Sequence, residues 1–204
     1  QPFETIITGD ASIQKRPMQR VVTPLVQMGA IIEARSSSNG WQSAPAGGPI
    51  LAPLKIKGQQ SLIGIDYTMP VASAQIKSAL LLAGLFADKK TSVTDPGLSR
   101  DHTERMMAQF GLPIHVSGNV STITPVESFR APSFVFIPSD ISSAAFWLVL
   151  GLILPDALIH IPHVGLNPTR TGILDAIEMM GGKIIIENEK RAVAGSSAGN
   201  PWAT

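Results

Sequence analysis

The stretch Met69-Pro-Val-Ala-Ser-Ala-Gln-Ile-Lys-Ser-Ala-Leu-Leu-Leu-Ala-Gly84 decides how this chain folds. Pro70 disfavours a helical conformation at the residue before it, so the stretch begins as a turn. Ser73 belongs to the residue types that cap helices, and the residues after it are apolar around almost the whole helix surface. The stretch therefore predicts a deeply buried helix over residues 73–87 that begins at Ser73.

The start of this helix has two interpretations. The first N–H groups of a helix have no intrahelical acceptor and lie at the positive end of the helix dipole, so they attract phosphate or carboxylate. A polar Ser73-Ala74-Gln75 tip on a buried helix fits such an anion site. An ordinary N-cap is the simpler explanation, and it is the commonest use of serine at this position.

Composition narrows the class of protein. The 204 residues are 44% hydrophobic and 15% charged, which is typical of a globular chain with one or two domains. The net charge of +1 gives no reason to expect nucleic acid or a membrane surface as a partner. There is no cysteine, so disulfides and thiolate metal sites are excluded and a cytoplasmic location is expected.

Apolar periodicity and turn residues predict the order of elements along the chain. Helices are predicted over residues 16–28, 73–87, 99–110, 140–153 and 169–180, and a mobile loop over 36–48. Strands are predicted over residues 5–8, 30–34, 54–57, 62–69, 91–94, 113–116, 120–124, 134–137, 158–161 and 183–187. The order over 62–125 recurs in part before and after it, which predicts an α/β (α+β) protein of repeated βαβαββ units.

Each predicted unit has a helix that ends at a glycine followed by an apolar strand, at Gly29, Gly111 and Gly181. The first and last units are incomplete, as expected of an internal portion of a longer protein. Residues 191–204 are rich in small residues without periodicity, and we predict that they form a flexible or non-native tail.

Cationic residues recur at the predicted helix starts. Arg16 precedes the first helix, where its guanidinium can grip a carboxylate or phosphate; a surface arginine is the alternative. The segment Ser99-Arg-Asp-His-Thr-Glu-Arg105 combines a cap, a cation and an i,i+4 pair of Asp101 with Arg105. Within it, His102 is either an acid–base group or a lone surface histidine. The last long predicted helix likewise begins with a polar segment that carries a cation, Asn167-Pro-Thr-Arg170.

Other site chemistries find no support in the sequence. The four histidines lack metal-ligand spacing, so no protein-ligated metal is expected. No P-loop, Gly-x-Gly-x-x-Gly or Gly-x-Ser-x-Gly motif occurs. The polar and cationic helix starts that remain point to a small ligand with several negative charges.

Several of these segments closely resemble the 5-enolpyruvylshikimate-3-phosphate synthases, over about residues 5–190. The forms Ser73-Ala-Gln75 and Ser99-Arg-Asp-His-Thr-Glu-Arg105 resemble the branch often found in glyphosate-insensitive bacterial enzymes. The segments that carry the resemblance are Gly9-Asp10 with Arg16-Pro-Met18, Pro70 to Gly84, Ser99 to Arg105, Asp140-Ile-Ser-Ser-Ala-Ala-Phe146 and Val164-Gly-Leu-Asn-Pro-Thr-Arg170.

The resemblance implies a two-domain inside-out barrel with three βαβαββ units in each domain, incomplete in this chain. Residues 1–138 would hold two of the three units of one domain, the first of them partial. Residues 139–190 would hold the first, incomplete unit of the second domain, with Pro138-Ser-Asp140 at a crossover between the two.

The resemblance also implies an activity. Enzymes of this family transfer the enolpyruvyl group of phosphoenolpyruvate to the 5-hydroxyl of shikimate 3-phosphate, through a tetrahedral intermediate that loses phosphate. They use no metal or organic cofactor, and they serve the shikimate route to the aromatic amino acids. The expected partners are therefore these two small molecules, with no nucleic acid and no membrane.

The resemblance implies substrate-binding roles for individual residues of this chain. Ser73 is expected to donate to the phosphate of shikimate 3-phosphate, with the backbone N–H of Ala74 beside it and Gln75 against the ring. Arg100 is expected to pair with the same substrate, and Ser99 is a weaker candidate. Arg16 is expected to bind phosphoenolpyruvate, or glyphosate in its place. No catalytic residue is identified in this portion.

The chain departs from the family pattern. The Lys-Ser-x-x-x-Arg substrate motif, the Gly-Asn-x-Gly loop, and the later acidic, lysine and arginine groups do not occur in it. The alternative is therefore a catalytically incompetent fragment that keeps anion-binding helix starts. Such a fragment is expected to form a homodimer, or to join a complementing fragment, through exposed apolar faces.

Overall fold

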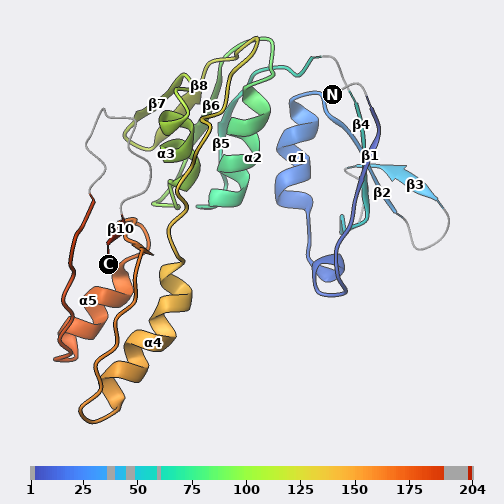
Figure 1. Ribbon diagram of the computed structural model, residues 1–204. Helices are drawn as coiled ribbons and strands as arrows, with labels where there is room; N and C mark the ends of the chain where they lie inside the picture. The colour runs from blue at the N-terminus through green and yellow to red at the C-terminus, as the bar shows by residue number, and fades with distance from the viewer. Residues whose placement is uncertain (1–2, 36–39, 45–48, 59–60, 191–201, 204) are drawn as a thin grey trace. The chain divides into compact units, whose positions relative to one another are not determined.

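The computed structural model describes residues 3–35, 40–44, 49–58, 61–190 and 202–203 (Figure 1). The chain divides into two compact units, each described separately below. The first unit comprises Gln1–Leu98 and Pro113–Ser128, and the second comprises Ser99–Leu112 and Phe129–Thr204. The domain ranges 1–138 and 139–190 stay a prediction.

The first unit contains two four-stranded sheets. One sheet has the strand order β1-β4-β2-β3 and is antiparallel throughout. Its strands are β1 (Thr5–Ile7), β2 (Ile31–Arg35), β3 (Trp41–Ser43) and β4 (Leu54–Lys57). Val22 of helix α1 (Gln19–Gln27) belongs to the same buried cluster as Ile32 and Leu54 of this sheet. Helix α1 therefore supplies the apolar cover of this sheet.

The second sheet of this unit has the strand order β5-β6-β8-β7, with β5 and β6 parallel and the other pairs antiparallel. Its strands are β5 (Asp66–Thr68), β6 (Thr91–Thr94), β7 (Ile114–Ser117) and β8 (Val120–Ile123). Helix α2 (Ala74–Gly84) packs on β6 and β8 and lies beside α1 (Figure 1). The predicted central helix is confirmed, and the strands predicted over 113–116 and 120–124 are confirmed as β7 and β8, which form a hairpin.

The second unit contains α3 (His102–Gln109), α4 (Ile141–Ile153) and α5 (Gly172–Met179). Strands β9 (Val164–Gly165) and β10 (Trp202–Ala203) form an antiparallel pair. The small core of this unit joins Ile141 and Ala144 of α4 to Val164 of β9. Of the predicted tail, Trp202–Ala203 form β10, and the rest lies outside the described residues.

Along the chain, β5, α2, β6, α3, β7 and β8 follow in the predicted βαβαββ order. Local signals explain the helix boundaries. Asp140 caps α4 by accepting a hydrogen bond from the Ser142 N–H. Gly29, Gly111 and Gly181 have positive φ angles of 90°, 70° and 83°, a conformation that glycine adopts without the steric penalty of a side chain. The predicted helix stops are thus confirmed.

Several predicted strands are absent from the described chain. Residues 134–137, 158–161 and 183–187 form no strand there, and Phe134 and Leu158 are 77% and 97% exposed. A strand needs a neighbouring strand for its backbone hydrogen bonds, and these apolar segments have none within the described residues. The strand predicted over 62–69 shortens to β5.

The loop predicted over residues 36–48 is partly wrong. Trp41–Ser43 form β3, which pairs with β2. The ammonium of Lys55 on β4 lies 4.7 Å from the centre of the Trp41 ring on β3, which is a cation–π contact. Residues 36–39 and 45–48 lie outside the described residues.

The first helix also starts later than predicted. Arg16 and Pro17 precede α1, which begins at Gln19 with Met18 as its N-cap, and Met18 makes no side-chain capping bond. Pro24 lies inside α1, where its missing N–H removes one helical hydrogen bond, and the helix continues to Gln27.

Gly84 illustrates how closely α2 packs on its sheet. A Cβ at this position would lie 2.6 Å from Ile123 Cγ2 and 2.8 Å from Thr91 Cβ. We therefore expect Gly84→Ala to lower the free energy of unfolding by about 1–3 kcal/mol, measured by urea denaturation. Gly172→Ala is the matched control, because nothing lies within 4 Å of a Cβ there. Equal stability of the two variants would contradict the tight packing.

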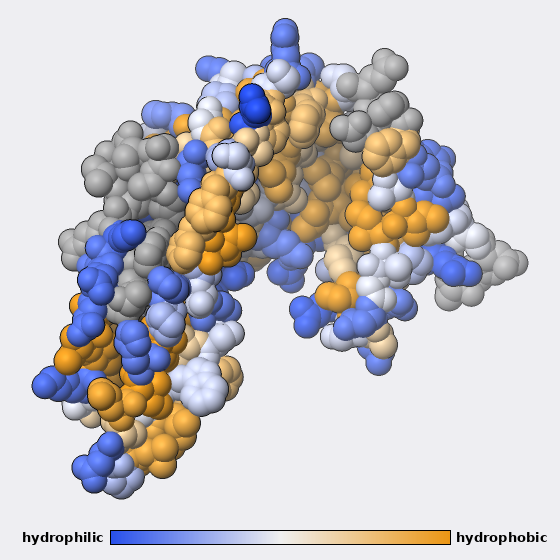
Figure 2. All heavy atoms as spheres, in the orientation of Figure 1, coloured by the Kyte–Doolittle hydropathy of each residue, from blue (hydrophilic) through white to orange (hydrophobic). Residues whose placement is uncertain are grey.

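The second unit exposes large apolar side chains, seen as orange on the surface in Figure 2. We call this the α4–α5 apolar surface; its members are Phe146, Trp147, Leu152, Ile153, Leu158, Met179 and Met180. A groove of about 700 Å³ runs among α4, α5 and residues 183–187. Exposed apolar area of this kind is typical of an interaction surface.

In the described part of the chain, no helix combines the length and apolar character needed to cross a membrane.

Candidate functional site

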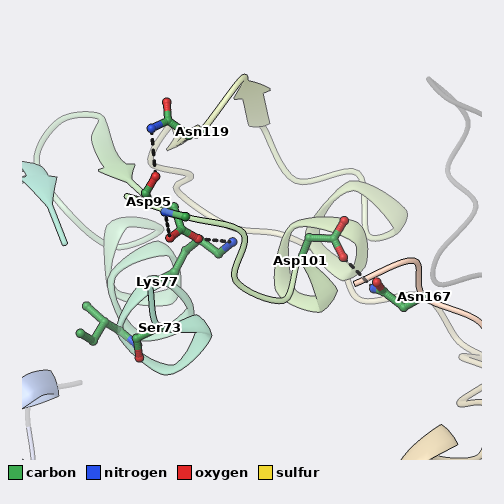
Figure 3. Close-up of polar contacts among 8 residues, drawn as sticks. Ser73, Lys77, Asp95, Asp101, Asn119 and Asn167 are labelled. Carbon is green, nitrogen blue, oxygen red and sulfur yellow. Dashed lines mark hydrogen bonds and ion pairs between the residues drawn. The ribbon is translucent and has the colours of Figure 1, made fainter. Parts of the chain in front are cut away.

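The start of α2 has the geometry of an N-cap. Ser73 is extended, with φ −151° and ψ 106°, and its hydroxyl oxygen accepts a hydrogen bond from the Ile76 N–H at 3.4 Å (Figure 3). The Lys77 N–H donates to the Ser73 carbonyl at 3.1 Å, which closes the first helical turn. The prediction that Ser73 caps the central helix is confirmed.

This turn presents hydrogen-bond donors to a ligand. A hydroxyl has one proton and two lone pairs, so Ser73 can accept from Ile76 and still donate to another acceptor. Ala74 and Gln75 are the first two helical residues, whose N–H groups have no intrahelical acceptor. Ser73 and Ala74 are half-buried and Gln75 is exposed. The structure thus brings these three predicted residues together at the positive end of a helix.

A buried ion pair lies one turn beyond the cap. The Lys77 Nζ lies 3.4 Å from Asp95 Oδ2, and each side chain is only 6% exposed (Figure 3). Asp95 Oδ1 accepts from the Gly97 N–H at 3.3 Å. The backbone of Asp95 exchanges two hydrogen bonds with Asn119: its carbonyl accepts from the Asn119 amide at 2.9 Å and its N–H donates to the Asn119 carbonyl at 2.8 Å.

Sequence reasoning missed this pair. The available signal was Lys77 itself, because it is the one charged residue in the apolar stretch 70–84. A lysine on a buried helix requires a carboxylate partner. Asp95 follows the next strand, β6, and is the first acidic residue after that strand.

Arg16 has a different setting from the one predicted. It follows a short 3₁₀ helix, η1 (Ile13–Lys15), and donates its backbone N–H to the Ile13 carbonyl at 3.0 Å. Its side chain is exposed. Because α1 begins only at Gln19, the prediction that Arg16 lies at the start of a helix is wrong. Its role toward phosphoenolpyruvate stays a prediction.

The second predicted helix start is shifted. Helix α3 begins at His102 with Asp101 as its N-cap, so the prediction that Ser99 caps it is wrong. The Asp101–Arg105 pair is confirmed, with Nε 2.8 Å from Oδ2. Ser99 is half-buried and Arg100 is exposed, and both precede α3 in the second unit. Their roles as ligands stay predictions.

Asn167 links this helix to a distant segment. Its buried amide donates to Asp101 Oδ1 at 2.6 Å (Figure 3). The same amide nitrogen lies 3.2 Å from His102 Nδ1. Its Oδ1 accepts from the N–H and the hydroxyl of Thr169, at 2.8 and 2.6 Å. A partner for His102 could not be read from the sequence, because Asn167 lies 65 residues away along the chain. The network fixes the start of α3.

A pocket of about 260 Å³ lies at the start of α4 and is lined in part by His102, Asp140, Asn167 and Arg170. The Arg170 guanidinium contacts the Ser142 hydroxyl and lies 3.8 Å from Asp140. Hydrogen bonding from the Ser142 backbone N–H lowers the pKa of the Asp140 carboxyl against the opposing effect of burial, with smaller lowering contributions from the Ser142 side chain, Arg170 and His102. The carboxylate itself occupies the helix N-terminus, where an anionic ligand would otherwise bind.

This pKa shift predicts a pH dependence for α4. A carboxyl whose folded pKa lies below its ordinary value of 3.8 stabilises the fold above that pH. The stability is lost as the pH falls through the lower, folded pKa. We expect the side-chain carbon resonance of Asp140 to titrate below 3.8 in the folded chain. Ser142→Ala keeps the backbone donor and should preserve most of the shift; an ordinary pKa in the parent chain would contradict the cap.

Among the described residues, no group of three or more His, Asp or Glu side chains is placed to hold a metal ion.

Comparison with known proteins identifies the family. The family described as EPSP synthase (3-phosphoshikimate 1-carboxyvinyltransferase) matches residues 1–201, and the chain belongs to this family. It is 49% identical over 190 residues to a 3-phosphoshikimate 1-carboxyvinyltransferase of Alkalilimnicola ehrlichii, covering 93% of this chain and 40% of that protein. It is 49% identical over 189 residues to one of Shouchella clausii, covering 93% and 41%.

The fold agrees with solved structures. An EPSP synthase from Acinetobacter baumannii superposes with a TM-score of 0.80 at 41% identity, covering 100% of this chain and 42% of that one. The predicted family and fold class are therefore confirmed. The chain spans about 40% of the length of the curated relatives that it matches.

Proposed function

We propose that this chain is a portion of an enzyme that transfers the enolpyruvyl group of phosphoenolpyruvate to the 5-hydroxyl of shikimate 3-phosphate and releases phosphate. Relatives that are 49% and 50% identical to this chain are named for this activity. Within that enzyme, the contribution of this chain is to bind shikimate 3-phosphate at the first turn of α2. The activity belongs to the synthesis of aromatic amino acids.

The capping geometry of Ser73 carries this proposal. Its oxygen is already oriented by the Ile76 N–H, so its proton can be directed at a phosphate oxygen without loss of the cap. The N–H groups of Ala74 and Gln75 and the helix dipole add to the attraction for a phosphate. The Gln75 side chain is exposed at the same turn and can lie against the ring of the substrate.

Arginine side chains complete the proposed recognition of the two anionic substrates. Arg100 pairs with shikimate 3-phosphate, Ser99 is a weaker candidate for the same ligand, and Arg16 binds phosphoenolpyruvate or glyphosate. A guanidinium suits these roles because its donors match carboxylate and phosphate oxygens in pairs. The exposure of Arg16 and Arg100 supports access to a ligand.

A second candidate is a non-catalytic fragment that binds the anion and associates with a second copy or a complementing fragment. The α4–α5 apolar surface favours it, because Phe146 and Leu158 are 79% and 97% exposed.

We also infer that the chain belongs to the glyphosate-insensitive branch of the family and that the protein is located in the cytoplasm. Support for the branch comes from the Ser73-Ala-Gln75 and Ser99 to Arg105 forms, and for the location from the lack of cysteine.

Calorimetric titration of the purified chain with shikimate 3-phosphate tests the binding role. We expect Ser73→Ala to raise the Kd about 10- to 100-fold, since hydrogen bonds to charged groups contribute about 1.5–3 kcal/mol. Ser61→Ala, at an exposed serine, is the matched control and should bind like the parent. Equal affinity of parent and Ser73→Ala would contradict the proposed site.

Phosphate release with both substrates separates the two candidates. Turnover that needs both substrates, and that falls in Arg16→Ala, would exclude the non-catalytic fragment. No turnover, together with retained binding of shikimate 3-phosphate, would favour it.

A further inference from the structure

The Lys77–Asp95 pair lies directly behind the proposed ligand-binding turn. Lys77 follows Ser73 by one helical turn and donates its N–H to the Ser73 carbonyl. Its ammonium is 3.4 Å from Asp95 Oδ2, with both side chains 6% exposed. At that burial neither group is available to a ligand in solution, so a direct contact with substrate does not explain the pair.

Stability does not explain the pair either. A cation near a helix N-terminus faces the positive end of the dipole. Removing two charges from water costs free energy that their attraction only partly recovers. Apolar residues of similar size at both positions often give an equal or more stable fold. The rest of α2 is apolar and buried, including Ile76, Leu80 and Leu81, so an apolar pair would suit its surroundings.

The ion pair defines the position of the first turn of α2. Asp95 is held on several sides: its carboxylate accepts from Gly97, and its backbone exchanges two hydrogen bonds with Asn119 in the β7–β8 turn. A carboxylate anchored in this way defines where the Lys77 ammonium lies (Figure 3). The first turn of α2 is thereby tied to the ends of β6 and β8 at one point, whereas apolar packing tolerates small shifts along the sheet.

We propose that Lys77 and Asp95 are positioning residues, and that their ion pair sets the orientation of Ser73, Ala74 and Gln75 for binding shikimate 3-phosphate. This inference rests on the proposed function, because it needs the first turn of α2 to be the binding site. Small displacements of donors strongly weaken a hydrogen bond to a charged group. Loss of the pair should therefore lower the affinity for shikimate 3-phosphate more than it lowers the stability of the fold.

The test replaces both charges at once, in the variant Lys77→Met/Asp95→Leu. We expect its Kd for shikimate 3-phosphate to rise about tenfold, which corresponds to about 1.4 kcal/mol. We expect its thermal unfolding midpoint to stay at or above that of the parent. Hydrogen exchange of the Ile76 amide, which donates to the Ser73 hydroxyl, should become faster.

The pair Lys57–Glu33 provides the matched control. It has a distance of 2.6 Å and lies on the other sheet of the same unit, with Lys57 47% exposed. The variant Lys57→Met/Glu33→Leu makes the same chemical change and should leave both the Kd and the Ile76 exchange unchanged.

The outcomes separate the two proposals. A Lys77→Met/Asp95→Leu variant that binds like the parent, with unchanged exchange at Ile76, would overturn the positioning role. If the parent itself fails to bind shikimate 3-phosphate, the proposed function fails and the role in substrate binding fails with it; the exchange rate then decides only whether the ion pair orders the first turn of α2. Faster exchange at Ile76 with a retained unfolding midpoint supports it, and unchanged exchange rejects it.

Discussion

Asp95→Asn is expected to lower the free energy of unfolding by about 3–5 kcal/mol, because it leaves the buried Lys77 ammonium facing a neutral amide. Asparagine keeps the side-chain oxygen that accepts from the Gly97 N–H, so the change is mainly one of charge. Urea denaturation at pH 7 measures the effect, and an unchanged slope would show that the unfolded state is comparable.

A second substitution isolates the cause of this loss. Adding Lys77→Met to Asp95→Asn removes the second charge and should recover most of the lost stability. If Asp95→Asn alone stays within about 1 kcal/mol of the parent, the ion pair is solvated in solution and the burial of Lys77 is wrong. If the second substitution brings no recovery, the loss comes from the aspartate's other contacts.

Leu80→Ala is expected to lower the free energy of unfolding by about 2–5 kcal/mol, because Leu80 is fully buried in α2. The cost combines the lost transfer free energy of the side chain with the cavity left in the core. Neighbouring Leu81 is also fully buried, so the site has little freedom to collapse.

Leu82→Ala, on the same helix, is the matched control. Leu82 is 46% exposed, so its truncation should cost well under half as much as that of Leu80. Both leucines have the same helix propensity, and any effect on the helix itself is common to the two variants. Equal losses would show that α2 presents a different face to its sheet.

Features fixed by neighbouring residues were predictable from the sequence. The cap at Ser73 and the three glycine helix ends depend on contacts within about one turn. The β7–β8 hairpin depends on the short turn at residues 117–119. The candidate site at Ser73, Ala74 and Gln75 was predictable for the same reason, because its donors are consecutive residues.

Features that depend on distant partners were not predictable. Residues 134–137 and 183–187 have the composition of strands, yet pairing depends on a neighbour that the local sequence does not encode. The Lys77–Asp95 and His102–Asn167 contacts join segments 18 and 65 residues apart. At Arg16 the error was local: Pro17 is favoured in a first helical turn, but here it precedes the helix by two residues.

The hydrogen bond between Asp101 and Asn167 spans 66 residues of chain. On a ribosome that adds 5–20 residues each second, Asp101 is made roughly 3–13 s before its partner. For that interval the start of α3 lacks the buried amide that later holds it, although the Asp101–Arg105 pair can already form. Residues of α2 and β6 in the first unit have been synthesised by then, so synthesis order favours folding of the first turn of α2 before the start of α3 is fixed.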